Sequence, residues 1–172
     1  MTQTQEAQSQ EMPQPQPQKE HAWLHQLVGD WVSEGSAEMP EHGGMTMGGT
    51  ETVRSLGGIW VVSEGEMRVN GEPCGNSRMS LGYDPAKGKF VGTWLGSMMT
   101  HLWVYEGTLD ADERVLTLDC EGPSFTDPST LAPYQDVITI IGADHWTLTA
   151  RTRGEDGAWT TFMTTHYRRT AA

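Results

Sequence analysis

Apolar and polar residues alternate along most of this chain, as they do in β-strands with one buried and one solvated face. Between residues 31 and 39, Trp31, Ala37 and Met39 fall on one face, whereas Glu34 and Glu38 fall on the other. The alternation recurs in the segments 59–69, 79–83, 90–97, 102–109, 115–120, 135–141, 146–153 and 159–168. This pattern predicts an all-β domain of about ten strands.

Short polar links between these segments indicate that neighbouring strands pair as antiparallel hairpins. Such links stand at residues 70–71, 84–88, 110–113, 142–144 and 154–157. An open meander would leave two unpaired edges, which closure into a barrel removes. We therefore predict a closed, antiparallel up-and-down β-barrel, with irregular loops at residues 40–49 and 122–133.

A short amphipathic helix is predicted ahead of the barrel, over residues 20–28 and ended by Gly29. The apolar residues that recur there at helical spacing are Trp23, Leu24, Leu27 and Val28. Residues 1–20 consist largely of Gln, Pro, Glu, Ser and Thr. A stretch of that composition is expected to be a disordered tail, which leaves residues 21–170 as a single barrel domain.

The charge of the chain argues against two classes of partner. Its 172 residues carry a formal net charge of −12, which repels phosphate backbones and anionic lipid headgroups. No segment reads as a signal peptide or a membrane span. We expect neither nucleic acid nor a membrane as a partner, a cytoplasmic location, and reduced thiols at Cys74 and Cys120.

Two short sequence features near the ends of the barrel region resemble those of lipocalin-like (calycin) barrels. Gly29-Asp30-Trp31 opens the first strand, and Arg168 and Arg169 close the last. The resemblance implies that the Trp31 indole plugs one end of the barrel and that a guanidinium, from Arg168 or Arg169, stacks on it.

Three further blocks resemble DUF1579, a family of uncharacterised bacterial proteins. They are the run from His25 to Trp31, the block Leu81-Gly82-Tyr83-Asp84-Pro85 with the following Phe90 to Trp94, and the terminal Tyr167-Arg168-Arg169. The likeness extends from about residue 21 to residue 169. It implies a lipocalin-like barrel and brings no activity that can be assigned residue by residue.

Aromatic residues gather on one face of the strands at 90–97 and 102–109. They are Phe90, Trp94, His101, Trp103 and Tyr105, and Gly92, Gly96 and Gly107 share that face. If the face is internal, large rings beside missing side chains would leave a ligand pocket. If it is external, it would be an aromatic contact surface, and core packing without a ligand is the third reading.

Few residues of the sequence indicate catalysis or the binding of a metal or haem. Nucleophile elbows, phosphate loops and His-Glu-x-x-His are absent from the sequence, so no class of enzyme is indicated; we lean against catalysis but leave it open, and we predict no metal and no cofactor. Met39, His42, Met45 and Met47 could suit a soft ion or form a mobile flap. His166 invites comparison with the haem-binding nitrobindin barrels, but the alternation that turns Tyr167 inward turns His166 outward.

These observations lead to one prediction and two alternatives. We predict that a small apolar or amphipathic molecule binds inside the barrel, lined by the aromatic residues at 90–105. The alternatives are a haem- or metal-binding barrel and a protein-interaction module without a ligand. The sequence leaves the identity of the ligand and self-association open.

Overall fold

The computed structural model describes residues 14–171, which form one short helical segment and ten strands. The helical segment consists of α1 (Lys19–Leu24) and the 3-10 turn η1 (His25–Leu27). The strands are β1 (Gly29–Met39), β2 (Gly43–Leu56), β3 (Trp60–Val69), β4 (Glu72–Asp84), β5 (Lys89–Gly96), β6 (Trp103–Leu109), β7 (Val115–Pro123), β8 (Leu131–Gly142), β9 (His145–Arg153) and β10 (Trp159–Arg169).

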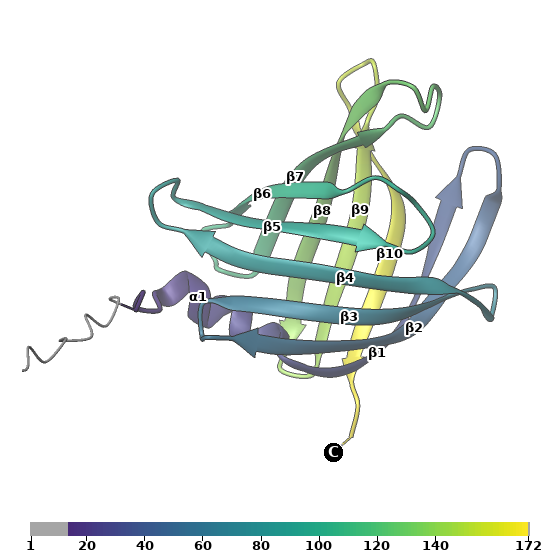
Figure 1. Ribbon diagram of the computed structural model, residues 1–172. Coiled ribbons are helices and arrows are strands. Elements are labelled where there is room, and N and C mark those ends of the chain that lie inside the picture. The colour runs from purple at the N-terminus through teal and green to yellow at the C-terminus, as the bar shows by residue number, and fades with distance from the viewer. Residues whose placement is uncertain (1–13, 172) are drawn as a thin grey trace, which may run out of the picture.

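Every strand pairs antiparallel with its neighbours in sequence, and β1 pairs with β10 to close the sheet into a barrel (Figure 1). The fold class and the N-terminal helix predicted from the alternation are therefore confirmed. Among residues 14–171 no helix is long and apolar enough to cross a membrane. Most of the tail predicted at residues 1–20 lies outside the described residues, and α1 begins at Lys19.

One strand was missed by the pattern analysis. Residues 43–49, expected to be part of an irregular loop, belong to β2, which pairs with β1 from Gly43 to Val53. Glycines and an inward-facing Glu51 obscure the alternation of β2 in the sequence. Gly49 has φ +151°, and a Cβ there would lie 1.9 Å from the Glu66 carbonyl oxygen, so the neighbouring strand requires a glycine.

The helical segment seals one end of the barrel, which we call the closed end. Trp23, Leu24 and Leu27 are buried in the core cluster. The Trp23 indole donates a 2.7 Å hydrogen bond to the Glu113 carbonyl oxygen in the turn between β6 and β7. The amphipathic spacing of the helix therefore positions its apolar side against the barrel and fixes it to one of the turns at that end.

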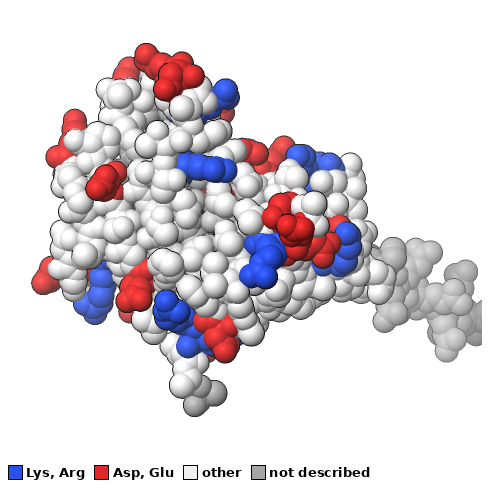
Figure 2. Space-filling view, turned by 180° about the vertical axis from the view of Figure 1, so that it is seen from behind, with Lys and Arg blue, Asp and Glu red and all other residues white. Residues whose placement is uncertain are grey.

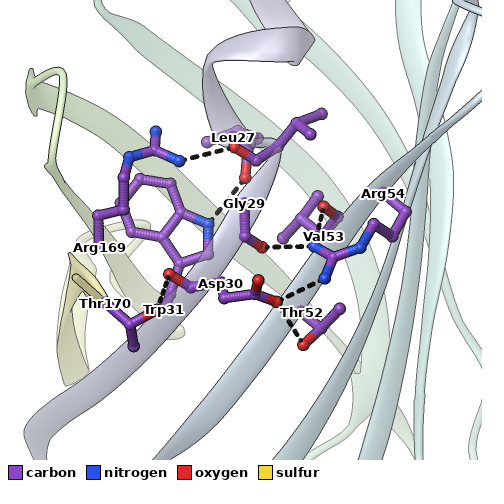
Figure 3. A network of polar contacts seen from close by, with 10 residues as sticks. Leu27, Gly29, Asp30, Trp31, Thr52, Val53, Arg54, Arg169 and Thr170 are labelled. Carbon is purple, nitrogen blue, oxygen red and sulfur yellow. Dashed lines mark hydrogen bonds and ion pairs between the residues drawn. The ribbon is translucent and has the colours of Figure 1, made fainter. Parts of the chain in front are cut away.

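Trp31 lies directly beneath this segment and is only 1% exposed. Its Nε1 donates a 2.8 Å hydrogen bond to the Leu27 carbonyl oxygen (Figure 3). The Arg169 guanidinium lies 4.2 Å from the centre of the indole ring. On another side the ring meets Trp146 edge-on, with 5.9 Å between centroids.

Arg169 connects three parts of the closed end. Besides covering Trp31, it donates hydrogen bonds to the carbonyl oxygens of Val28 at 2.9 Å and Ala143 at 3.0 Å. A Cβ at Gly29 would lie 2.1 Å from Arg169 Nη1, and Gly29 has φ +147°, so the guanidinium needs a glycine there. Arg168 instead faces outward, 3.8 Å from Glu34.

The outer surface carries both signs of charge. Figure 2 shows acidic and basic side chains interspersed among wide uncharged areas on the face opposite to that of Figure 1. The six ion pairs among the described residues all join partly or largely exposed side chains. Such pairs contribute little to stability, so the barrel depends on its ladders and its core.

The buried position of Trp31 generates a stability prediction. Trp31→Ala removes an aromatic side chain from the core and leaves the Arg169 guanidinium without its ring. We expect the free energy of unfolding to fall by about 3–5 kcal/mol, measured by urea denaturation. Val32→Ala is the matched control, because Val32 is the next residue and is 50% exposed. If the free energy of unfolding fell no more in Trp31→Ala than in the control, Trp31 would not be the residue that plugs the barrel.

Candidate functional site

The barrel encloses a cavity of about 310 Å³ that extends from the Trp31 end toward the opposite, open end. Met99, 43% exposed, and the exposed Cys74 lie where it reaches the surface. The apolar part of the lining comes mainly from methionines, from Trp94, Trp103 and Phe162, and from aliphatic residues of β3, β4, β8 and β9. A cavity with so much apolar lining favours an apolar occupant.

The methionines are the most distinctive part of the lining. Every methionine of residues 14–171 takes part in it: Met39, Met45, Met47, Met67, Met79, Met98, Met99 and Met163. They come from five strands and from the link between β5 and β6. Because methionine is unbranched, flexible and polarisable, such a lining adapts to the shape of an occupant.

The five residues predicted to bind a ligand divide between four places. Trp94 and Trp103 line the cavity. Tyr105 is buried behind the lining, 2% exposed, and donates a 2.5 Å hydrogen bond to Asp136. Phe90 packs at the closed end against Trp23 and Tyr83, with centroid distances of 5.9 and 5.2 Å.

His101 lies on the outer side of the wall. Its Nε2 donates to the Glu121 carbonyl oxygen at 2.8 Å, and its ring meets Trp103 edge-on. The ladder between β6 and β7 runs only from Glu106–Asp119 to Leu109–Leu116. Beyond it, the Trp103 ring covers Gly122, where a Cβ would lie 2.2 Å from the indole. Side chains therefore complete this part of the wall.

The expectation that glycines open the cavity is wrong. A Cβ at Gly92 would lie 2.0 Å from the Ser80 carbonyl oxygen, and one at Gly107 would lie 2.6 Å from Leu118. At Gly96, Met98 and Trp94 already occupy the space. These glycines allow neighbours to approach closely, and the empty volume lies elsewhere, between the methionines.

Three acidic residues contribute to the cavity lining: Glu66, which is exposed, and Glu51 and Asp136, which sequence reasoning did not single out. Asp136 of β8 is accessible from the cavity and is bonded to the Tyr105 hydroxyl. Burial raises the pKa of Asp136 to about 6, and the hydrogen bond from Tyr105 offsets part of that rise. Burial and the adjacent Asp136 raise the pKa of Tyr105 well above its usual range, so the phenol keeps its proton.

Glu51 of β2 is the second inward carboxyl. It pairs with Trp31 on one side and with Gly65 on the other, and a Cβ at Gly65 would lie 2.4 Å from Glu51 Oε2. Gly65 therefore provides the space for this carboxyl. Burial raises the pKa of Glu51, and the nearby Ser63 hydroxyl offsets part of that rise. The Ser63 hydroxyl lies close to the carboxyl but does not form a hydrogen bond with it.

Buried polar atoms without partners lie in the same region. Ser63 Oγ and Trp146 Nε1 have no hydrogen-bond partner among the described residues, and both residues line the cavity. Tyr167 stacks on Trp146 at a centroid distance of 3.7 Å, and burial, Glu51 and Asp136 together raise the pKa of its phenol. The inner part of the cavity thus offers several groups that can hydrogen-bond to an occupant.

The histidines lie away from the cavity. None of the six is part of its lining, and His166 faces outward with its Nδ1 3.0 Å from His145 Nε2. Within residues 14–171 no three His, Cys, Asp or Glu side chains are grouped as a metal site would need. The haem reading of His166 therefore gains no support from its position.

The raised pKa of Asp136 generates a prediction about pH. Between the ordinary value of 3.8 and about 6, the folded chain holds a proton that the unfolded chain has lost. The free energy of unfolding therefore falls as pH rises through this window, by roughly 2–3 kcal/mol in total. Asp136→Asn keeps an acceptor for the Tyr105 hydroxyl and removes the free-energy cost of ionising a buried carboxyl. The variant should therefore be more stable than the wild type at pH 7.5 in urea denaturation.

The control for this experiment is Asp112→Asn, which changes an exposed carboxyl in the turn between β6 and β7. It should leave the pH dependence unchanged. An Asp136→Asn protein that is equally stable or less stable than the wild type at pH 7.5 would show that burial of this carboxylate costs nothing.

Comparisons with known proteins identify the fold and the family. No curated protein matches the sequence. Rv2717c from M. tuberculosis has a TM-score of 0.59 and 15% identity, over 86% of this chain and 95% of its own. The S-type phycobiliprotein lyase CPES from Guillardia theta has a TM-score of 0.59 and 14% identity, over 91% and 99%. These likenesses show the barrel fold alone.

The family is given by the sequence itself. The model of DUF1579, described as a protein of unknown function, matches residues 16–169. That span includes α1 and all ten strands, so the resemblance seen in three sequence blocks holds for the whole barrel. The chain belongs to the DUF1579 family.

Proposed function

We propose that this protein binds a small, mainly apolar molecule inside its barrel. The observation that supports the proposal is the cavity itself, lined by every described methionine and by Trp94 and Trp103. Its volume of about 310 Å³ falls at the lower end of the range of small-molecule pockets. A barrel built only for stability would fill this space with side chains.

The mouth of the cavity supports the same proposal. The link between β5 and β6 brings Met98 against Gly96, and the Trp103 indole donates to Met99 Sδ at 3.2 Å. From the other side, the hairpin of β1 and β2 contributes Met39, Met45 and Met47. Flexible thioethers at the entrance can move aside and then pack against a ligand.

Trp94 and Trp103 are the contact residues that we propose from the original set of five. Both present their rings to the cavity, and each is partly exposed there rather than packed on all sides. Large aromatic surfaces contribute strongly to binding when a ligand covers them. Tyr105 would act indirectly, by orienting Asp136.

Binding of a neutral fluorescent probe tests the proposal. N-phenyl-naphthylamine should bind saturably, with enhanced probe fluorescence and quenched tryptophan emission. Ala150→Leu places an isobutyl group in the cavity, because Ala150 is 4% exposed and lines it. We expect the affinity for the probe to fall at least about tenfold, with an overpacking cost of about 1–3 kcal/mol in stability.

Ala86→Leu is the matched control, since it makes the same change in the exposed turn between β4 and β5. It should bind the probe like the wild type. Absence of saturable binding to the wild type, or equal binding by the Ala150→Leu protein when circular dichroism shows it folded, would count against an internal binding site.

A further inference from the structure

The inner part of the cavity holds two carboxyl groups with no positive charge beside them. Neither Glu51 nor Asp136 takes part in any of the ion pairs among the described residues. Of the residues of 14–171 that line the cavity, none is Lys, Arg or His. Buried carboxylates are normally paired with a cation or held by several donors, whereas Asp136 has only the hydrogen bond from Tyr105 and neither carboxyl has a cation.

We infer that the ligand carries a cationic nitrogen, such as a protonated amine, which lies in the inner part of the cavity near Glu51, Ser63 and Asp136 while its apolar body lies among the methionines. This inference rests on the proposed function and names the class of molecule that the cavity selects. An ammonium group there would bring a positive charge into a cavity whose described lining carries only negative ones. An anionic headgroup would instead add a third negative charge to the same place.

Ser63 is an independent observation that points to an occupant. Its side chain is 6% exposed, faces the cavity beside Glu51, and has no hydrogen-bond partner for Oγ. A buried hydroxyl left without a partner costs free energy. An ammonium has three N–H donors, so it can bond to Glu51 and to Ser63 Oγ at once.

The arrangement along β2 sets the orientation of such a ligand. Glu51 pairs with Trp31 at the closed end, whereas Met47 and Met45 lie four and six residues farther toward the mouth. At about 3.3 Å per residue, these distances are roughly 13 and 20 Å. The polar group therefore belongs at the inner end and the apolar body toward the opening.

Arg169, the cation that covers the Trp31 ring at the closed end, does not fulfil this role. Its guanidinium lies over the Trp31 ring and donates to Val28, Ala143 and Asp144 at the closed end. The burial-driven rise in the pKa of both carboxyls has no opposing contribution from any cationic side chain. Among the described residues, the lining of the cavity therefore carries negative charge without a cationic side chain beside it.

Three probes with one apolar body and different headgroups test the inference: naphthylethylamine, naphthylethanol and naphthaleneacetate. Isothermal titration calorimetry at pH 7.5 should give the tightest binding for the amine and the weakest for the carboxylate. Glu51→Gln and Asp136→Asn should each weaken the amine at least about tenfold and change the affinity for the alcohol by less than about twofold.

Two further variants separate the site from the acidic surface. Glu38→Gln removes an exposed carboxylate from the outer face of β1, so it should leave binding of the amine unchanged. Gly65→Ala keeps both internal charges but displaces the Glu51 carboxyl, because the atoms nearest to the added Cβ belong to the side chains of Glu51 and Ser77. It should weaken the amine selectively, with thermal melts confirming that each variant is folded.

The outcomes distinguish this inference from the proposed function. Equal binding of amine and alcohol, preference for the carboxylate, or loss of the amine in Glu38→Gln would overturn the cationic ligand. If the neutral probe N-phenyl-naphthylamine binds and none of the three naphthyl probes does, the inference fails while the binding function stands. If the neutral probe also fails to bind, both fail.

Discussion

The contact between Trp31 and Arg169 is the constraint on which the rest of the barrel depends. It joins the start of β1 to the end of β10, the two strands whose pairing closes the sheet. The same guanidinium is bonded to the helical segment through Val28 and to the β8–β9 turn through Ala143. One end of the barrel is therefore fixed by a small, fully bonded group of residues, and the opposite end can remain open.

This division between the two ends explains how one interior is both stable and partly empty. Around Trp31, aromatic rings and aliphatic side chains fill the space, as the burial of Trp23, Leu24 and Leu27 shows. Toward the mouth, the packing gives way to methionines around the cavity. Cavities lower stability in proportion to their size, so the well-packed end offsets the cost of the open one.

The fold was predictable from the sequence and the site only in part. Period-two alternation, short polar links and the Gly29-Asp30-Trp31 opening together gave a closed barrel with an N-terminal helix. Trp94 and Trp103 could be predicted as residues of the cavity lining because apolar and polar positions alternate regularly in their strands. Glu51 was missed because glycines break the pattern of β2, although it stands at an inward position two residues before Val53. Asp136 could have been identified from the sequence, because it is a charged residue at an inward position of an alternating strand, between Tyr134 and Ile138.

The sequence could not show which side chains fill the space beside the glycines, because this depends on the register between neighbouring strands. Whether Gly107 borders a void or a Leu118 methyl is decided by which residues face each other across two strands. A shift of one residue would reverse the result. Individual strands show their inward positions in the sequence, but the volume left between ten of them is a property of the assembled sheet.

The short ladder between β6 and β7 has a consequence for how the barrel moves. Above Glu106 and Asp119, the wall is completed by the Trp103 ring over Gly122 and by the bond from His101 to Glu121. Separating the strands there would break no ladder hydrogen bond between β6 and β7, and segments with fewer backbone hydrogen bonds open at a lower cost in free energy. The side chains of Trp103 and His101, rather than ladder hydrogen bonds, therefore hold this part of the barrel wall together.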